Sequence, residues 1–336
     1  MAPCYLHGAR RHYALGVDTH REAQGEAGGG GTVGAQVDAA RAAVLVVRAT
    51  DRSALEAVGP DARTWLNGLV TCDIASLPEG RAAYGLAVTQ KGRILADLWA
   101  IVDGPRVVVV VPASQASALA ATFDKYLIME DVELREVDSA IWHLHGPRSS
   151  DVLAAARAAG AASADADVTG LGGAIVVAPR DREAAVDAAI GAAVLRAGGA
   201  RGDDASWDTL RLEHAVPRFG ADFDLLTYPH EAALEKRAVS FEKGCYLGQE
   251  VVCMLEMRGH VKRKLAPIVV RAGEPPAKGA EVFDGAGAKV GEVTSAAWSA
   301  RAGASVALAM VKLAAATPGT ALTVGGAPAE VVTAAT

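Results

Sequence analysis

The sequence predicts an α+β protein that ends in a small β-barrel. Between residues 44 and 195, helical and strand-like segments mix without the long regular alternation of strand and helix that a doubly wound sheet requires. From residue 265 onward the pattern changes to short apolar runs spaced by Gly and Pro, which is typical of a small barrel. At 336 residues and 51% hydrophobic composition, the chain is long enough for two or three domains with substantial cores.

The first half of the chain reads as a strand-rich block after a Gly-rich loop. The glycines at 25 and 28–31 predict a loop or linker that follows a weakly structured N-terminus. Apolar runs and turn residues then predict a strand, a short helix, three strands separated by turns, a helix and a strand. In chain order these elements cover residues 44–47, 61–69, 84–89, 93–103, 107–111, 115–126 and 132–137.

The second half continues this rhythm and then becomes a barrel. A strand, an alanine-rich helix, a strand and a helix are expected over residues 141–145, 149–159, 175–178 and 182–195. Alanine is the best helix former but buries little area, so these helices are expected at the periphery. The barrel strands are expected over residues 268–270, 289–294, 305–310, 321–324 and 330–332.

This pattern divides the chain into four parts. Residues 1–40 are the weakly structured segment and linker, and residues 41–140 are a first α+β part. Residues 141–262 are a second α+β part, and residues 263–336 are the barrel.

Composition narrows the class of protein without naming a function. The formal charge of -6 gives no global attraction to nucleic acid or to an anionic membrane. Four cysteines, at positions 4, 72, 245 and 253, form neither a disulfide framework nor a paired metal-ligand pattern, so a reducing cytoplasm fits best. The N-terminus lacks a signal-peptide core and no run of about 18 apolar residues occurs, so we expect no membrane contact.

One short motif has the residue types of a reactive thiol site. The run from Lys243 to Glu250 sets Cys245 between a cation and two glycines, Gly244 and Gly248. A neighbouring Lys lowers the pKa of a thiol, and glycines allow a ligand to approach closely. The alternative is that Cys245 is a small buried residue and that the glycines only connect secondary structure.

Segments across the chain together resemble one family. They cover residues 59–63, 65–73, 91–95, 210–213, 217–220, 243–250, 291–295 and 307–309. The run Lys-Gly-Cys-Tyr-x-Gly-Gln-Glu is the most specific of them. On these residues the chain resembles the YgfZ-type folate-binding proteins, relatives of the aminomethyltransferase (T-protein) of the glycine cleavage system.

The resemblance implies a three-part aminomethyltransferase-like fold around a central cleft that holds tetrahydrofolate or a derivative. A reduced pteridine has an edge of donors and acceptors that suits a carboxylate or an amide, and a flat face that suits an apolar wall. Its glutamate tail suits Arg or Lys. The residues expected to bind it are Arg211, Glu213, Tyr84, Phe219, Tyr246, Gln249 and Glu250, with Trp99 as a further part of the wall. An ordinary exposed ion pair is the alternative for Arg211 and Glu213.

Two departures from the aminomethyltransferase pattern bear on activity. The resemblance calls for an Asp-Asp pair after Gly-Gly-Ile-Leu, but here Leu95 is followed by Ala96 and Asp97. The transferase also carries a Thr-Gly-Tyr-Thr-Gly-Glu segment, whereas residues 169–174 of this chain contain no acid. Asp97 remains as a catalytic candidate that could meet the folate.

Two functions therefore stay open. The first, implied by the resemblance, is a tetrahydrofolate-binding accessory or regulatory protein that supports assembly or repair of iron–sulfur enzymes, including tRNA-modifying ones. The alternative is a tetrahydrofolate-dependent aminomethyl- or methyltransferase. Folate-dependent release of an aminomethyl group separates them, and absence of folate binding would point to a decayed site on a retained scaffold.

The cysteine motif is expected to act through its thiol. Cys245, with Lys243 as its cation, is expected to be a reactive thiol that meets iron–sulfur enzymes or assembly proteins transiently. A permanent cluster needs four thiolates at ligand spacing, which the other cysteines do not show. Cys253 is a possible resolving thiol or an incidental buried one.

Two other groups of residues give weaker evidence of a functional site. The basic run from Arg258 to Lys264 lacks interleaved aromatic residues, so direct RNA binding is not expected. His143 and His145 alternate on one strand face, but no third ligand lies nearby in sequence, so no metal site is predicted.

Overall fold

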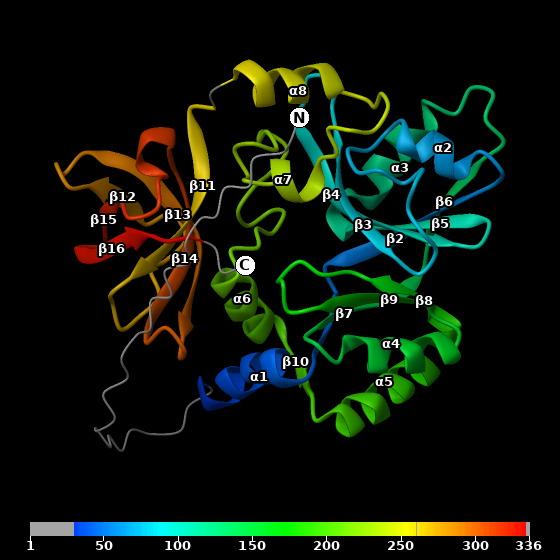
Figure 1. The fold of residues 1–336 in the computed structure, drawn as a ribbon, viewed down its shortest axis with the longest axis horizontal. Coiled ribbons are helices and arrows are strands. Elements are labelled where there is room, and N and C mark those ends of the chain that lie inside the picture. The colour runs from blue at the N-terminus through cyan, green and yellow to red at the C-terminus, as the bar shows by residue number, and fades with distance from the viewer. Residues whose placement is uncertain (1–29, 260, 334–336) are drawn as a thin grey trace, which may run out of the picture.

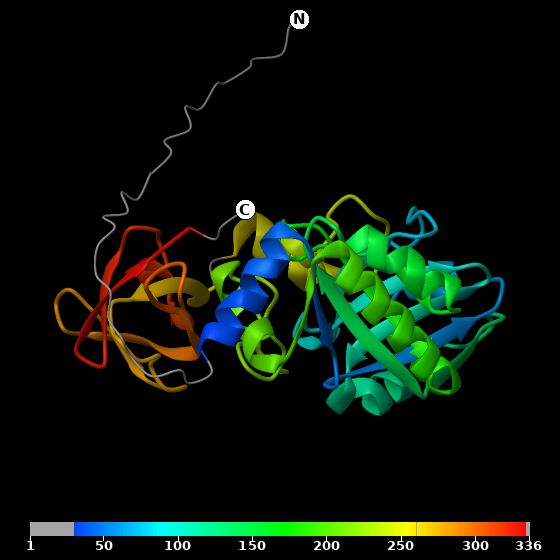
Figure 2. The same ribbon diagram turned by 90° about the horizontal axis from the view of Figure 1, so that it is seen from below.

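A computed structural model of the chain describes residues 30–259 and 261–333. It confirms the α+β class and the C-terminal barrel: two five-stranded sheets are followed by a closed barrel. Figure 1 shows the barrel on one side of the molecule and the two sheets on the other, with helices α1, α6 and α7 between them. Turned by 90°, the same order holds (Figure 2).

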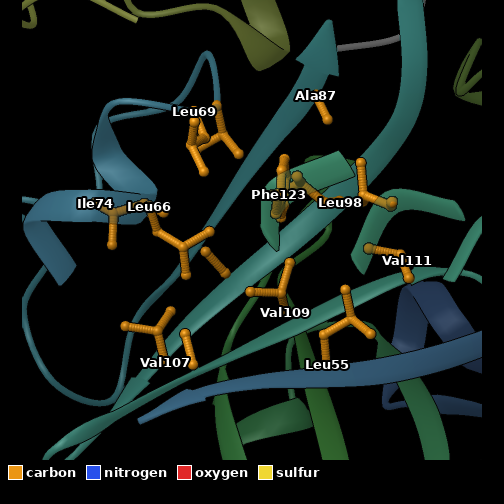
Figure 3. Close-up of a cluster of buried hydrophobic side chains, with 14 of the residues drawn as sticks. Leu55, Leu66, Leu69, Ile74, Ala87, Leu98, Val107, Val109, Val111 and Phe123 are labelled. Atoms are coloured by element: carbon orange, nitrogen blue, oxygen red, sulfur yellow. The ribbon is translucent and has the colours of Figure 1, made fainter. Parts of the chain in front are cut away.

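The first sheet has the order β3-β4-β5-β2-β6 and is antiparallel throughout. Its strands are β2 (Arg52–Val58), β3 (Ala82–Val88), β4 (Ile94–Asp103), β5 (Arg106–Pro112) and β6 (Glu133–Val137). Helices α2 (Ala62–Asn67) and α3 (Ala116–Asp124) pack on one face of this sheet, where Leu66 and Phe123 meet Leu55, Leu98 and Val109 (Figure 3). Strand β5 is a run of valines because both of its faces are covered.

The second sheet has the order β10-β1-β7-β9-β8, in which only the β1–β10 pair is parallel. Its strands are β1 (Leu45–Arg48), β7 (Ser139–His145), β8 (Ala162–Asp165), β9 (Gly173–Pro179) and β10 (Ala200–Gly202). Helices α4 (Ser149–Ala158) and α5 (Glu183–Ala197) cover its outer face. The inner faces of the two sheets pack on each other through residues such as Ile101, Ile141 and Ile175. The result is a helix–sheet–sheet–helix sandwich.

Three helices connect the sandwich to the barrel. They are α6 (Asp204–Glu213), α7 (Glu235–Ala238) and α8 (Gln249–Arg258). The barrel closes in the order β11-β14-β13-β12-β15-β16. Its strands are β11 (Arg263–Val270), β12 (Glu281–Asp284), β13 (Lys289–Ser299), β14 (Ala304–Lys312), β15 (Ala321–Val324) and β16 (Ala327–Val331).

Helix α1 (Gly30–Ala42) corrects one expectation. It runs through the end of the segment that we expected to be weakly structured as far as residue 40, while residues 1–29 lie outside the described part of the chain. The helix forms because Val37 and Ala40 share a face that is buried against Leu45 and Leu210. The glycines at its start concealed this apolar spacing.

Candidate functional site

A pocket with a cavity volume of about 50 Å³, the Asp97 pocket, lies where strands of both sheets meet helix α6. Two of its walls come from the sheets, and the third comes from α6 and the residues that follow it. Its lining residues are Val47, Arg48, Ala49, Asp51, Arg52, Tyr84, Asp97, Trp99, His143, Val168, Asp204, Trp207, Val216, Pro217 and Arg218.

Strand register gathers the first three site residues. Asp97 and Trp99 are two residues apart on β4, so they share a face, and Tyr84 of β3 lies directly opposite Trp99. The Tyr84 and Trp99 rings are 5.0 Å apart and tilted by 49°. The structure therefore brings Tyr84, Trp99 and Asp97 together in one pocket.

Asp97 is a buried acid with hydrogen-bond partners at both oxygens. Its two oxygens accept hydrogen bonds from Nη1 and Nη2 of Arg52, both at 3.0 Å, and Oδ2 also accepts one from the Tyr84 hydroxyl at 3.1 Å. Burial raises the pKa of Tyr84 well above its usual value, and the charge of Asp97 adds to this shift, so the phenol keeps its proton. Burial alone would lower the pKa of Arg52, but Asp97 outweighs it and raises that pKa. The Arg52 guanidinium therefore stays charged.

A stack of flat rings continues the wall of the pocket. His145 stacks on Trp207 of α6, with centroids 4.4 Å apart and planes 4° apart, and it lies 6.2 Å from His143. Burial lowers the pKa of both histidines to about 3, so each is neutral at physiological pH. The two strand positions alternate onto one face, as predicted. Within the described chain, no group of three or more His, Cys, Asp or Glu is placed to hold a metal ion.

A second hollow, with a cavity volume of about 510 Å³, shares Tyr84 and Trp99 with the first. Arg81 and Arg237 also line it. The Arg237 guanidinium donates one hydrogen bond, to the His214 carbonyl at 3.3 Å. Both hollows therefore combine the shared aromatic rings with carboxylates and guanidinium groups.

Two predicted ligand residues lie elsewhere. Arg211 is 2% exposed, and its guanidinium donates to Asp208 at 2.5 Å, to Asp222 at 2.8 Å and to the Val216 carbonyl at 3.2 Å. Glu213 accepts from Arg41 and, at 2.5 Å, from Ser299. Neither residue lines the Asp97 pocket or its neighbour. Nor do Arg211 and Glu213 pair with each other, so the exposed ion pair considered for them is absent as well.

Phe219 and Tyr246 support the wall from behind. Both pack in a cluster that also includes Tyr84, and Phe219 meets Phe223 edge to face at 5.6 Å. Tyr246 is 6% exposed. Neither residue lines the Asp97 pocket. They pack behind its wall, whereas they were expected to contact the ligand directly.

The cysteine motif forms a loop that is hydrogen-bonded to the segment at and just after helix α2. The Lys243 ammonium donates to the carbonyls of Asn67, Val70 and Cys72, at 2.5, 2.8 and 2.7 Å. Burial lowers the pKa of Lys243 to about 8, partly offset by Cys72 and Asp73. Cys245 itself is exposed. The cation expected to activate this thiol is thus occupied by backbone oxygens.

The end of the motif begins helix α8. Gly248 precedes the helix with φ of 79°, and a side chain there would meet the Thr89 carbonyl at 2.3 Å, so only glycine fits. Gln249 is half-buried and Glu250 is exposed in the first turn. Neither lines the Asp97 pocket.

Sequence reasoning missed Arg52 and Trp207 as site residues. Arg52 opens a strand that was not predicted, and Trp207 lies in a helix that was not predicted. His143 had been considered only as half of a chelating pair. The one available signal was the Asp203–Ser206 capping box, which marks the start of α6.

Comparison with known proteins gives matches along the whole fold. Residues 25–169 match the GCVT N-terminal domain, and residues 263–335 match the glycine cleavage T-protein C-terminal barrel domain. The chain is 28% identical over 210 residues to the tRNA-modifying protein YgfZ of Vibrio vulnificus (strain YJ016), covering 62% of this chain and 64% of that protein. It therefore spans just under two thirds of the length of that relative.

Two aminomethyltransferases are also similar. One, from Streptomyces coelicolor, is 30% identical over 293 residues, which cover 78% of this chain and 76% of that protein. The crystal structure of the glycine cleavage system aminomethyltransferase T from Bartonella henselae superposes with a TM-score of 0.78 at 22% identity, covering 90% of this chain and 88% of that one. That likeness concerns the fold alone.

Proposed function

Because this chain belongs to the GCVT family of the glycine cleavage T-protein, we propose that it is a tetrahydrofolate-binding accessory protein. Its role is to support assembly or repair of iron–sulfur enzymes, including tRNA-modifying ones. The observation that carries the folate part is Asp97, a buried carboxylate held beside the Tyr84 and Trp99 rings in a pocket.

The residues present fit a reduced folate. A pteridine ring needs a flat apolar wall and an acceptor for its N–H groups, which Trp99, Tyr84 and Asp97 would provide. A folate tail carries carboxylates, and Arg237 lines the second hollow, which shares the Tyr84 and Trp99 rings. When bound, the folate supplies one-carbon chemistry; the residues named here bind and orient it.

Aminomethyl transfer is the less favoured function. Ala96 stands where the transferase pattern calls for a second acid, and both oxygens of Asp97 accept from Arg52. A carboxylate held by a guanidinium is a poor proton donor, because loss of its charge would leave the buried cation unpaired. The retained binding residues and this engaged acid together support an accessory role.

The support for a partner role is the loop that presents Cys245. This thiol is exposed, whereas Cys72 is buried and burial raises the pKa of Cys72 to about 12. The YgfZ relatives are named as tRNA-modifying proteins, which is consistent with a partner among tRNA-modifying enzymes.

A tetrahydrofolate titration by calorimetry tests the binding proposal. We expect wild type to bind, and Asp97→Asn to bind at least about tenfold more weakly, because a charge-assisted hydrogen bond is lost. Glu213→Gln is the matched control and should bind like wild type, since Glu213 lies outside the pocket. Failure of wild type to bind would refute the proposal.

The accessory role needs a separate measurement. In cells that lack this protein, the activity of iron–sulfur-dependent tRNA-modifying enzymes should fall, and wild type but not Asp97→Asn should restore it. Folate-dependent release of an aminomethyl group by the purified protein would instead favour the transferase.

A further inference from the structure

We infer that Arg52 determines which pteridine the pocket accepts. Together, Arg52 and Asp97 present a donor beside an acceptor, an edge that fits a 4-oxo pteridine and rejects the 4-amino form. This inference rests on the proposed folate function and adds to it the residue that selects the ring.

The geometry leaves donors of Arg52 free for a ligand. A guanidinium has five N–H groups. Two of them bond Asp97 at 3.0 Å, and in the described part of the chain no partner exists for the other three. Arg52 lines the pocket with 13% of its side chain exposed, whereas the Asp97 side chain is 3% exposed. The guanidinium therefore faces the space that a ligand would fill.

The donor and acceptor roles along this edge are fixed. The Arg52 guanidinium stays protonated because Asp97 raises its pKa. The Tyr84 hydroxyl keeps its proton and donates it to Oδ2 of Asp97, so its one donor is used within the wall of the pocket. The polar order that a ligand meets is therefore a carboxylate acceptor beside a guanidinium donor.

This order matches one of two closely similar rings. A 2-amino-4-oxo pteridine places N–H donors at N3 and at the 2-amino group beside a carbonyl oxygen at C4. Oδ1 of Asp97, which accepts one hydrogen bond from Arg52, would accept one more from these donors, and Arg52 would donate to the carbonyl oxygen. A 4-amino ring places a donor where that oxygen stood and is more basic, so its N–H groups or its positive charge would face the guanidinium.

Changing one group of the ligand, from 4-oxo to 4-amino, should lower its affinity for the pocket strongly. A site built to hydrogen-bond a ligand atom rejects the analogue that lacks it, because the buried polar group of the site is then left unpaired. Without Arg52, the carboxylate alone would favour the more basic 4-amino ring. Removing Arg52 should therefore abolish or reverse the preference, not merely weaken binding.

The test compares tetrahydrofolate with 4-amino-4-deoxytetrahydrofolate by calorimetry. We expect wild type to favour tetrahydrofolate by at least about tenfold. Arg52→Met should bring this ratio to one or below. Arg106→Met is the matched control: Arg106 also pairs with a buried acid of the same sheet, Glu56, but lies outside the pocket, so the ratio should stay as in wild type.

The outcomes separate the two proposals. If wild type binds neither compound, the folate function fails. If wild type binds both equally, or if Arg52→Met keeps the wild-type ratio, the role of Arg52 is overturned while the folate function stands. Thermal denaturation shows whether Arg52→Met is folded. Should it unfold, Arg52→Lys retains a positive charge without the planar fork, and a wild-type ratio in that folded variant would also overturn the inference.

Discussion

Lys243 shows how one side chain can join two distant segments. Its ammonium is held by three backbone oxygens that lie at and just after the end of helix α2. The same segments are also joined by Ser240 N–H to the Thr71 carbonyl at 2.9 Å and by Leu247 N–H to the Gly68 carbonyl at 3.0 Å. The lysine of the motif is thus an anchor for the loop that carries Cys245.

Replacing Lys243 should make the loop more mobile without lowering the reactivity of the Cys245 thiol. Lys243→Met removes three charge-assisted hydrogen bonds, so we expect the free energy of unfolding to fall by about 1–3 kcal/mol. Hydrogen exchange across residues 240–248 should become faster. Urea denaturation and exchange mass spectrometry measure these effects, with Lys289→Met, an exposed barrel lysine, as the control.

The same variant separates anchoring from activation. If Lys243 acts only as an anchor, iodoacetamide should alkylate Cys245 in Lys243→Met at least as fast as in wild type. A fall of about tenfold would mean that the ammonium acts on the thiol directly, as in activated cysteines.

At the scale of elements, β7 carries a pH-dependent contribution to stability. His143 and His145 are neutral in the folded state because burial lowers the pKa of each from 6.5 to about 3. Below pH 6.5 the unfolded chain therefore binds protons that the folded chain does not, so stability is lost as the pH falls from 6.5 toward 3.

His145→Phe tests this contribution. Phenylalanine keeps a flat ring against Trp207 but cannot titrate. Between pH 6.5 and 5, the wild-type free energy of unfolding should fall with a slope that approaches about 1.4 kcal/mol per pH unit for each histidine. In the variant, the part of this slope that comes from His145 should be absent. Urea denaturation across this range measures both slopes, and equal slopes would contradict the assignment.

Elements were predictable where local pattern and burial agreed. The valine run of β5 and the alternation in β7 predict strands from sequence alone, and both were found. Strand β2 was not predicted because Glu56 interrupts its apolar residues. That acid is tolerated in a buried strand because Arg106 and Arg135 of the neighbouring strands pair with it, a contact that exists only in the folded sheet.

At the scale of the whole molecule, the site was half predictable. Tyr84, Asp97 and Trp99 lie on paired strands, so strand alternation places them together. Arg52 and Trp207 come from β2 and α6, which only tertiary packing brings to the same pocket. Arg211 was expected to bind the ligand because it is a charged residue in a matched segment. Its buried guanidinium instead pairs with two acids of the protein, Asp208 and Asp222.

Arg211 instead links the sandwich side of the molecule to the barrel. It pairs with Asp222, whose other oxygen accepts from Thr294 of barrel strand β13 at 2.6 Å. The Asp222 side chain is fully buried. One buried charge therefore holds together α6, the residues that follow it and the barrel.

Arg211→Met should destabilise the whole molecule while sparing the pocket. Asp222 would be left as a buried charge without its guanidinium, so the free energy of unfolding should fall by about 3–5 kcal/mol. Tetrahydrofolate affinity of the folded protein should stay as in wild type, because Arg211 does not line the Asp97 pocket. Urea denaturation and calorimetry measure the two quantities, with exposed Arg180→Met as the control. Weaker folate binding at unchanged stability would return Arg211 to the ligand site.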